Sequence, residues 1–332
     1  MAPKSRSTRL LAWLIGIFVF VSAVLGAACN FMVKFSLAPD PGRENIDSVA
    51  LILYGRYPDI KPWVDSIRTN GHLKDTFVVM PGGERHHAFY MEADNAKGRT
   101  AVVVHGYRDS AIKFFYLMRM YNRDLGYNVL MPDLHAHGYS EGEMIQMGWK
   151  DADDVLQWAG IAENRFHADG YESEVIIHGV SMGAATTMNV SGKANLPTYI
   201  KGFIEDCGYT TVWDEFAGQL KEQFSLPAFP LMHMASALCD IRYGWNFKEA
   251  SPLESVKRCT RPMLFIHGDK DDFVPTWMVY PLYEAKPEPK TLWIAPGSDH
   301  AASYQDHPEE YTEQVKNFVQ DLGLSRNMAQ EQ

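Results

Sequence analysis

The clearest chemical signal in the chain is Ser181, which stands at the centre of a Gly-x-Ser-x-Gly sequence at residues 179–183. A short apolar run precedes this motif and small helix-forming residues follow it, which is typical of a strand, a sharp turn and a helix start. A serine at such a turn exposes its hydroxyl beside the free N–H groups of the helix's first turn. The flanking Gly179 and Gly183 fit positions where strand and helix backbones lie too close for a Cβ. These residues predict a nucleophilic serine.

A serine hydroxyl is a weak nucleophile at neutral pH, so it needs a base to take its proton and an acid to orient that base. Candidates stand downstream of Ser181, in the sequence GDKDDFVP and in the sequence GSDH, which ends at His300. The first of these holds three aspartates, which are Asp269, Asp271 and Asp272. Asp206 also ends a predicted strand and is a further candidate acid, although a helix N-cap or a turn hydrogen bond explains it better.

The elements that must position these residues are strands that alternate with helices. Apolar runs predict strands at residues 101–104, 128–131, 175–177, 200–204, 263–267 and 292–295, after a hairpin of residues 77–80 and 87–91. Helical spacing marks residues 111–125, 148–166, 276–284 and 309–322. This alternation predicts right-handed βαβ units and a mostly parallel sheet, whose sites lie beyond the C-terminal ends of the strands. The polar residues found at those ends are His105, Asp133, Ser181, Asp206, Asp271 and His300.

Five short sequences together resemble one known family: HGYRDS, PDLHAHGYSEG, HGVSMG, HGDKDDFVP and GSDH. Roughly residues 76–322 resemble the α/β-hydrolase superfamily, and within it the membrane-anchored BEM46/ABHD-like serine hydrolases. The resemblance implies the α/β-hydrolase fold, with a mostly parallel central sheet and helices on both faces. At about residues 210–258 the alternation stops and aromatic and methionine residues become frequent, so we expect a mainly helical cap insertion there.

The resemblance assigns catalytic roles residue by residue. Ser181 would be the nucleophile and His300 the general base, in the chain order serine, aspartate, histidine that this family uses. The family's acid stands three residues before the valine of its GxxDxxVP pattern, which is Asp271 here. Asp269 and Asp272 are close alternatives. Asp299, next to His300, is expected to be a loop residue.

The same family stabilises the reaction's oxyanion with two backbone N–H groups. One belongs to Met182, directly after the nucleophile. The other belongs to the residue that follows His-Gly in the first loop, which is Tyr107. Because both donors are main-chain groups, changing either side chain need not abolish activity.

The remaining histidines are expected to be structural. His135 and His137 form a His-x-His pair that could bind a metal, but the sequence shows no further ligand cluster, and the resemblance places them in a structural turn. His178 and His267 are expected to be packed in the core.

The adjacent His86 and His87 enter a strand and are expected at the surface. The sequence holds no Walker loop, dinucleotide-binding fingerprint or zinc spacing, so we expect no cofactor and no metal.

The N-terminal segment at residues 10–29 carries no charged side chain, and three basic residues precede it. About 20 apolar residues span a bilayer as a helix, and a positive flank stays in the cytoplasm. We therefore expect a single-pass signal anchor with a cytoplasmic N-terminus and an extracytoplasmic catalytic domain. Cleavage after Ala28, which would give a secreted protein, and lipidation of Cys29 are the alternatives.

The composition limits the partners. The net charge is −10, which argues against a nucleic-acid partner because such a partner favours a basic surface. Three cysteines follow the apolar segment: Cys207, Cys239 and Cys259. One disulfide with a free thiol and three reduced thiols both remain open.

The expected organisation has five parts. They are a basic tail (1–9), the anchor (10–29), a connecting lead-in (30–75), the hydrolase domain (76–324) with its cap at about 210–258, and a C-terminal tail (325–332).

We expect a carboxylesterase-like serine hydrolase that forms an acyl-enzyme on Ser181 and acts on a small-molecule ester. The apolar cap favours an apolar acyl or aryl group. A peptidase or thioesterase with the same three residues is the first alternative, and no acidic pair that would hold a peptide N-terminus is evident. A non-catalytic binding protein is the second alternative, because fold alone does not fix function.

Overall fold

Eight strands form one sheet in the order β1-β2-β4-β3-β5-β6-β7-β8. The computed structural model describes residues 6–330, so Lys4 of the predicted basic tail and the last two residues of the predicted C-terminal tail lie outside it. Strand β2 pairs antiparallel with β1 and β4, and all other neighbours are parallel. The strands are β1 (Lys74–Val79), β2 (Arg85–Met91), β3 (Arg99–Val104), β4 (Asn128–Pro132), β5 (Glu174–Val180), β6 (Ile200–Asp206), β7 (Met263–Gly268) and β8 (Lys290–Ala295). The predicted mostly parallel sheet and its first hairpin are confirmed.

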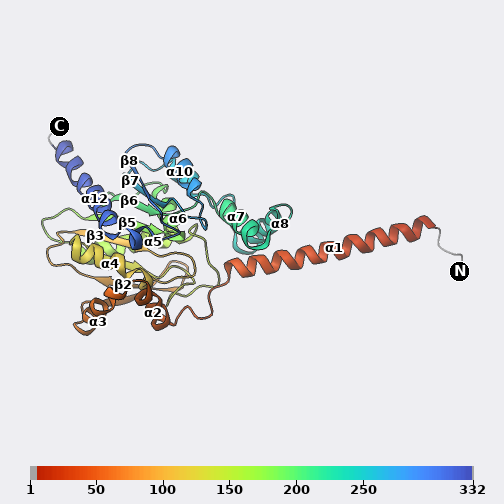
Figure 1. Cartoon of the computed structure of the whole chain (residues 1–332), viewed down its shortest axis with the longest axis horizontal. Coiled ribbons are helices and arrows are strands. Elements are labelled where there is room, and N and C mark those ends of the chain that lie inside the picture. Colours follow the sequence, from red (N-terminus) through yellow and green to blue (C-terminus); the bar gives the residue numbers. More distant parts are fainter. Residues whose placement is uncertain (1–5, 331–332) are drawn as a thin grey trace.

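Helices cover both faces of this sheet (Figure 1). Alternate strand residues face opposite sides, so Val102 and Val104 join one buried cluster and Ala101 and Val103 the other. Helices α5, α6 and α10 pack on the first face, and α2, α3 and α12 on the second. The helices are α1 (Arg6–Leu37), α2 (Ile46–Arg56), α3 (Lys61–Thr69), α4 (Phe115–Arg119), α5 (Asp151–Phe166), α6 (Met182–Ser191), α7 (Val212–Phe224), α8 (Leu231–Tyr243), α9 (Pro252–Val256), α10 (Val279–Ala285), α11 (Ser303–Asp306) and α12 (Pro308–Gln330).

Two predicted helices differ locally from expectation. The segment at residues 111–125 is composite, with a 3₁₀ turn η2 (Ala111–Phe114), α4 and a π-helical turn η3 (Met120–Asp124), and Gly126 at φ +70° ends it. The helix predicted to begin at Gly148 instead begins at Asp151. Gly148 has a φ of +72°, which a right-handed helix cannot accommodate.

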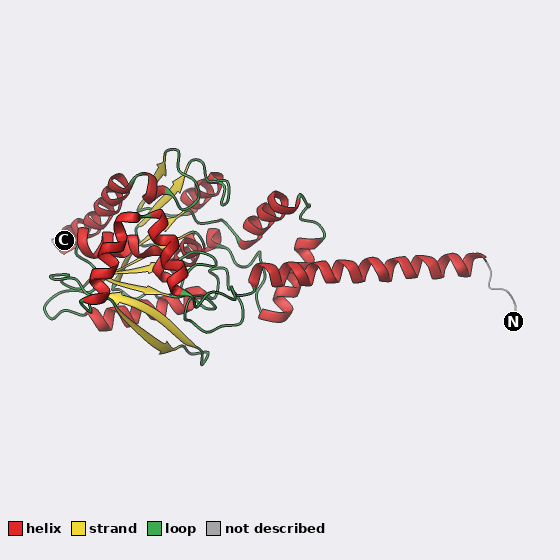
Figure 2. Cartoon of the chain, turned by 60° about the horizontal axis from the view of Figure 1, so that its bottom comes forward, coloured by secondary structure: helices red, strands yellow, loops and turns green. Residues whose placement is uncertain are grey.

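The N-terminal helix α1 projects from the domain as a single long rod (Figures 1 and 2). Residues 10–37 form a helix long and apolar enough to cross a membrane, and most of their side chains up to residue 24 are exposed. The predicted anchor ended at Cys29, but the helix continues to Leu37. Cys29, Val33 and Leu37 are buried against the domain. The first part of α1 is thus an exposed apolar helix, and its last part belongs to the packed core.

The expected insertion at residues 210–258 contains α7, α8 and α9. Helices α7 and α8 lie beside the C-terminal part of α1 in both views (Figures 1 and 2). Buried side chains of α8, Met232 and Cys239, belong to the same cluster as Val33. We refer to residues 210–258 as the cap.

Candidate active site

Ser181 occupies a strained turn between β5 and α6. Its φ of 58° and ψ of −119° lie outside the regions that non-glycine residues ordinarily adopt. A Cβ on Gly179 would overlap the carbonyl of Gly183, and a Cβ on Gly183 would overlap the carbonyl of Val104. The structure therefore confirms the reason for both glycines, since the turn can form only where the backbones come this close.

Ser181, His300 and Asp271 form a continuous chain of hydrogen bonds. His300 Nε2 lies 2.8 Å from Ser181 Oγ, and His300 Nδ1 lies 2.7 Å from Asp271 Oδ2. An ionised carboxylate only accepts hydrogen bonds, so the ring hydrogen of His300 is on Nδ1 and Nε2 accepts from the serine hydroxyl. The fold thus brings together three residues from loops that follow β5, β7 and β8.

Asp271 is fixed by several donors. Its Oδ1 accepts the backbone N–H groups of Phe273 at 3.0 Å and Val274 at 2.8 Å. His267 Nε2 lies 3.3 Å from Oδ2 of Asp271 and donates to the Val274 carbonyl at 2.9 Å. Burial acts to raise the pKa of Asp271, but hydrogen bonds and charges from His267 and His300 outweigh it and lower the pKa. The carboxylate therefore stays ionised and can stabilise a positive charge on His300.

The other candidate acids face elsewhere. Asp206 accepts a hydrogen bond from the Tyr311 hydroxyl at 3.0 Å, and its backbone carbonyl accepts the N–H of Ser181 at 2.8 Å. Asp206 thus holds the turn of Ser181 through its backbone. Asp269 accepts the N–H of Gly297 at 2.7 Å, while Asp272 and Asp299 are exposed.

Tyr107 and Met182 border Ser181 from two sides. Met182 is the first residue of α6, so its N–H is among the donors that lack an acceptor within the helix. Tyr107 belongs to residues 105–110, which follow β3 and which we call the oxyanion loop after the role expected for Tyr107. A Cβ on Gly106 of this loop would lie 3.4 Å from Ser181 Cβ. Both residues line the same cavity as Ser181.

The oxyanion loop is attached to the end of α1, a contact that the sequence did not predict. The Tyr107 hydroxyl donates to the carbonyl of Ser36 at 2.8 Å, and the Arg108 guanidinium donates to the carbonyl of Phe35 at 2.5 Å. The last carbonyls of a helix have no N–H donor within it, so these two side chains supply donors at the end of α1. The continued apolar pattern after Cys29 is the sequence signal that could have indicated this packing.

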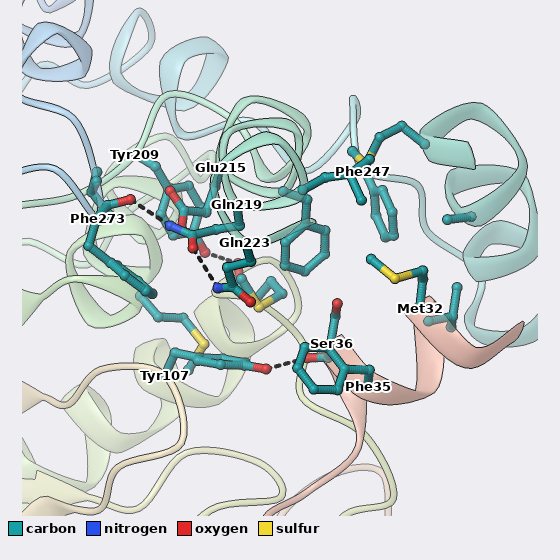
Figure 3. Close-up of a pocket in the computed structure, with 18 of the residues that line it drawn as sticks. Met32, Phe35, Ser36, Tyr107, Tyr209, Glu215, Gln219, Gln223, Phe247 and Phe273 are labelled. Atoms are coloured by element: carbon teal, nitrogen blue, oxygen red, sulfur yellow. Dashed lines mark hydrogen bonds between the residues drawn. The ribbon is translucent and has the colours of Figure 1, made fainter. Parts of the chain in front are cut away.

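An apolar cavity of about 190 Å³ opens next to Ser181 (Figure 3). Its walls come from α1, the oxyanion loop and the cap. The apolar residues that line it include Met32, Val33 and Phe35 of α1, Phe216 and Leu220 of α7, Met232 of α8, and Phe247. The helix predicted only as an anchor is thus one wall of the cavity.

A second cavity, of about 240 Å³, also has Ser181 in its lining and includes His300. We call it the charged cavity because Arg56, Asp109 and Lys113 line it. Lys113 pairs with Asp109 at 2.6 Å. Ser181 therefore lines both the apolar cavity and a cavity that holds charged side chains.

Glu215 is a buried carboxyl in the wall of the apolar cavity that the sequence reasoning missed. Burial, with a smaller contribution from the negative charge of Asp271, raises the pKa of Glu215 to about 8. The group is therefore neutral at pH 7, which suits an apolar cavity. Its position in the cap, among residues expected to be core, gave no sequence signal.

Several histidines outside this site are buried, and for two of them the prediction was wrong. His86 and His87 were expected at the surface, but both are buried, because β2 lies between β1 and β4 and both its faces are covered. His87 Nδ1 lies 2.7 Å from Asp133 Oδ2. His178 is a packed core residue as predicted, between the hydroxyls of Tyr121 and Tyr311 at 2.9 Å each.

The cysteines are unpaired among the residues that the structure describes. Cys207 lies near Asp271 and His300. Burial, together with nearby carboxylates, raises the pKa of its thiol well above the usual value. A neutral thiol is a poor nucleophile, so Ser181 is the better nucleophile of the two.

Residues 101–314 match the model of the alpha/beta hydrolase family. The chain therefore belongs to the alpha/beta hydrolase family. It is 31% identical over 236 residues to the uncharacterized protein YqkD of Bacillus subtilis, covering 71% of this chain and 76% of that protein. It is also 26% identical over 215 residues to the uncharacterized membrane protein YNL320W of Saccharomyces cerevisiae, covering 64% and 67%.

Solved structures with the same fold include esterases and peptidases. The Pyrococcus furiosus esterase Pf2001 superposes with a TM-score of 0.60 at 21% identity, over 77% of this chain and 93% of that one. The acylaminoacyl peptidase of Pyrococcus horikoshii gives a TM-score of 0.54 at 20% identity, over 76% and 41%. At these identities the likeness establishes the α/β-hydrolase fold.

Proposed function

We propose that this chain is a membrane-anchored, BEM46/ABHD-like serine hydrolase that cleaves esters of apolar acyl groups. The observation that carries the proposal is the hydrogen-bonded chain Asp271–His300–Ser181, which ends at the mouth of an apolar cavity. These three side chains supply the orienting acid, the base and the nucleophile that acyl transfer needs.

In the proposed reaction, Ser181 Oγ attacks the carbonyl carbon of the ester while His300 Nε2 takes the hydroxyl proton. The negative charge that develops on the carbonyl oxygen is stabilised by the backbone N–H groups of Met182 and Tyr107; each such donor contributes roughly 3 kcal/mol to transition-state stability. His300 then gives its proton to the departing alcohol. Water, activated by His300, releases the acid from Ser181.

The two cavities suggest how an ester would bind. The apolar cavity is suited to the acyl chain, and the charged cavity is suited to a polar alcohol. His300 lines the charged cavity, so it can protonate an alcohol that leaves on that side. An ester with an apolar acyl chain and a polar alcohol therefore fits this site best.

The position of α1 supports a membrane-associated substrate. Its exposed apolar part is suited to a bilayer and its buried part forms a wall of the apolar cavity. We propose a single-pass protein with its N-terminus in the cytoplasm and its catalytic domain outside, in which the cap at residues 210–258 closes the acyl site near the membrane. Release after Ala28 would leave this cavity wall in place, because the wall residues follow that position.

Turnover of p-nitrophenyl esters with increasing acyl length, measured on wild type and Ser181→Ala, tests the proposal. We expect turnover that rises with chain length in wild type and background rates in the variant. Equal rates in the two proteins would overturn the proposed mechanism. Matched thioester and dipeptide substrates in the same assay distinguish the thioesterase and peptidase alternatives.

A further inference from the structure

A second cluster of chemistry-bearing side chains lies outside the residues of the candidate active site. Glu84 precedes β2, His86 lies within β2, His135 follows β4, and Asp154 lies in α5. The antiparallel pairing of β2 with β4 places Ala88 opposite Pro132, so it brings the two histidines together. Their ring centroids are 5.6 Å apart.

The polar atoms of Glu84, His86 and His135 lie close together. His135 Nε2 lies 2.9 Å from Glu84 Oε2, and His86 Nε2 lies 3.8 Å from the same oxygen. One ligand atom from each of Glu84, His86 and His135 can be chosen so that all lie within 4.8 Å of one another. Asp154 Oδ2 lies 3.3 Å from Nδ1, the other ring nitrogen of His86.

His86 is not satisfied by these neighbours. The side chain is 1% exposed, and neither ring nitrogen makes a hydrogen bond with the part of the chain that the structure describes. A buried polar group without a partner is destabilising and calls for an explanation. A cation bound at Nε2, beside Glu84, would satisfy that nitrogen, and Nδ1 would then carry the ring hydrogen facing Asp154 Oδ2.

His135 points to the same conclusion. Its Nδ1 lies 2.8 Å from the carbonyl oxygen of Met144, which can only accept, so Nδ1 carries the ring hydrogen. In the neutral ring Nε2 then directs a lone pair at the carboxylate of Glu84, which is repulsive unless a cation lies between them. A protonated His135 would relieve that contact but would leave both nitrogens of His86 unsatisfied.

We propose that Glu84, His86 and His135 form a binding site for a zinc ion, with Asp154 beside the second ring nitrogen of His86. Two imidazoles and one carboxylate are ligands that Zn²⁺ accepts, with a fourth position left for water. A hydrogen bond from the second ring nitrogen to a backbone carbonyl, as His135 makes to Met144, is the usual arrangement of a metal-ligating histidine. Only the His-x-His pair was evident from the sequence, whereas Glu84 precedes β2, His86 lies within it and Asp154 comes from α5.

The site has a structural role in this proposal. The carbonyl of His135 lies 2.8 Å from Nδ1 of His137, and His137 Nε2 accepts the backbone N–H of Arg108 in the oxyanion loop at 3.1 Å. A metal on His135 would therefore fix the turn on which the oxyanion loop rests. No bond in the proposed reaction forms or breaks at the metal.

The test uses the full chain, freed of metal with a chelator and titrated with ZnCl₂ by isothermal calorimetry. We expect one ion per chain with a Kd below about 1 μM, and a higher melting temperature after binding. His86→Gln and His135→Gln should each weaken binding at least tenfold. His167→Gln is the matched control, since His167 also faces carboxylates, Glu163 and Asp169, but is half exposed.

A cobalt titration keeps the proposal testable if the ligand variants fail to fold. Wild-type protein loaded with Co²⁺ should show the intense visible absorption of tetrahedral cobalt, and ZnCl₂ should abolish it. Absence of this spectrum, absence of stoichiometric zinc binding, or equal affinity in His135→Gln and His167→Gln would each overturn the zinc site. Neither measurement depends on hydrolase activity.

Discussion

Replacing Val33 by asparagine tests whether α1 forms part of the acyl site. Val33 is 1% exposed and lines the apolar cavity, although it lies only four residues beyond the predicted end of the anchor. The substitution keeps a similar volume and places an amide in the wall. An acyl chain that fills the cavity must remove water from this amide, whereas a short acyl group need not reach it.

The size of the effect follows from desolvation. Burying an amide without a partner costs about 1–3 kcal/mol, which corresponds to a loss of roughly fivefold to hundredfold in kcat/KM. In wild type, each methylene buried in the cavity should contribute about 0.8 kcal/mol, or roughly fourfold in kcat/KM. We therefore expect Val33→Asn to lose roughly tenfold or more on octanoyl ester and less than about twofold on acetyl ester.

The assay is the kcat/KM of p-nitrophenyl acetate and octanoate, with melting temperatures recorded for each protein. Lys34→Asn is the matched control, because it places the same amide on an exposed position of the same helix. Equal losses on both esters together with a lowered melting temperature would indicate general destabilisation. An unchanged octanoyl preference in a Val33→Asn protein that keeps the wild-type melting temperature would refute the assignment of α1 to the acyl site.

Three further predictions concern the rest of the site. Asp271→Asn should lower kcat by roughly 10⁴-fold with little change in KM, because His300 then loses the acceptor that sets its tautomer; steady-state kinetics with a folding check measures this. Glu215 should ionise as the pH rises past about 8, so the KM of octanoyl ester should rise above that pH in wild type and stay constant in Glu215→Gln. Gly183→Ala should destabilise the fold by about 1–3 kcal/mol, because the new Cβ would overlap a backbone carbonyl. Gly218→Ala in α7, where a Cβ meets nothing within 4 Å, should instead stabilise the fold by up to about 1 kcal/mol. Urea unfolding of the two variants measures both changes.

Local backbone chemistry made the turn of Ser181 predictable. The glycines at 179 and 183 indicate that two backbone segments lie close together, and this constraint is evident within five consecutive residues. The parallel sheet was equally accessible, because strands buried on both faces produce continuous apolar runs. Both inferences depend on short-range patterns.

Features that depend on tertiary packing were not predictable in the same way. His86 and His87 were predicted at the surface because two polar residues at the start of a strand give the same sequence pattern whether or not neighbouring strands and helices cover them. The choice among the three aspartates of GDKDDFVP rested on family resemblance, and spacing alone could not show that Asp269 turns toward Gly297 while Asp271 turns toward His300.

The dual role of α1 was hidden for a related physical reason. An apolar residue suits a bilayer and a protein core equally well, so hydropathy does not mark where the membrane segment ends and the cavity wall begins. The contacts of Tyr107 and Arg108 with the end of α1 became visible only in three dimensions.

The most direct test of the central claim is covalent labelling by a fluorophosphonate probe, followed by intact-protein and peptide mass measurement. We predict one probe per chain, attached to Ser181, with loss of esterase activity in proportion to labelling. Ser181→Ala, shown to be folded by its melting temperature, should neither label nor hydrolyse ester. Labelling at another residue, or ester turnover by Ser181→Ala equal to wild type, would contradict the assignment of Ser181 as the nucleophile.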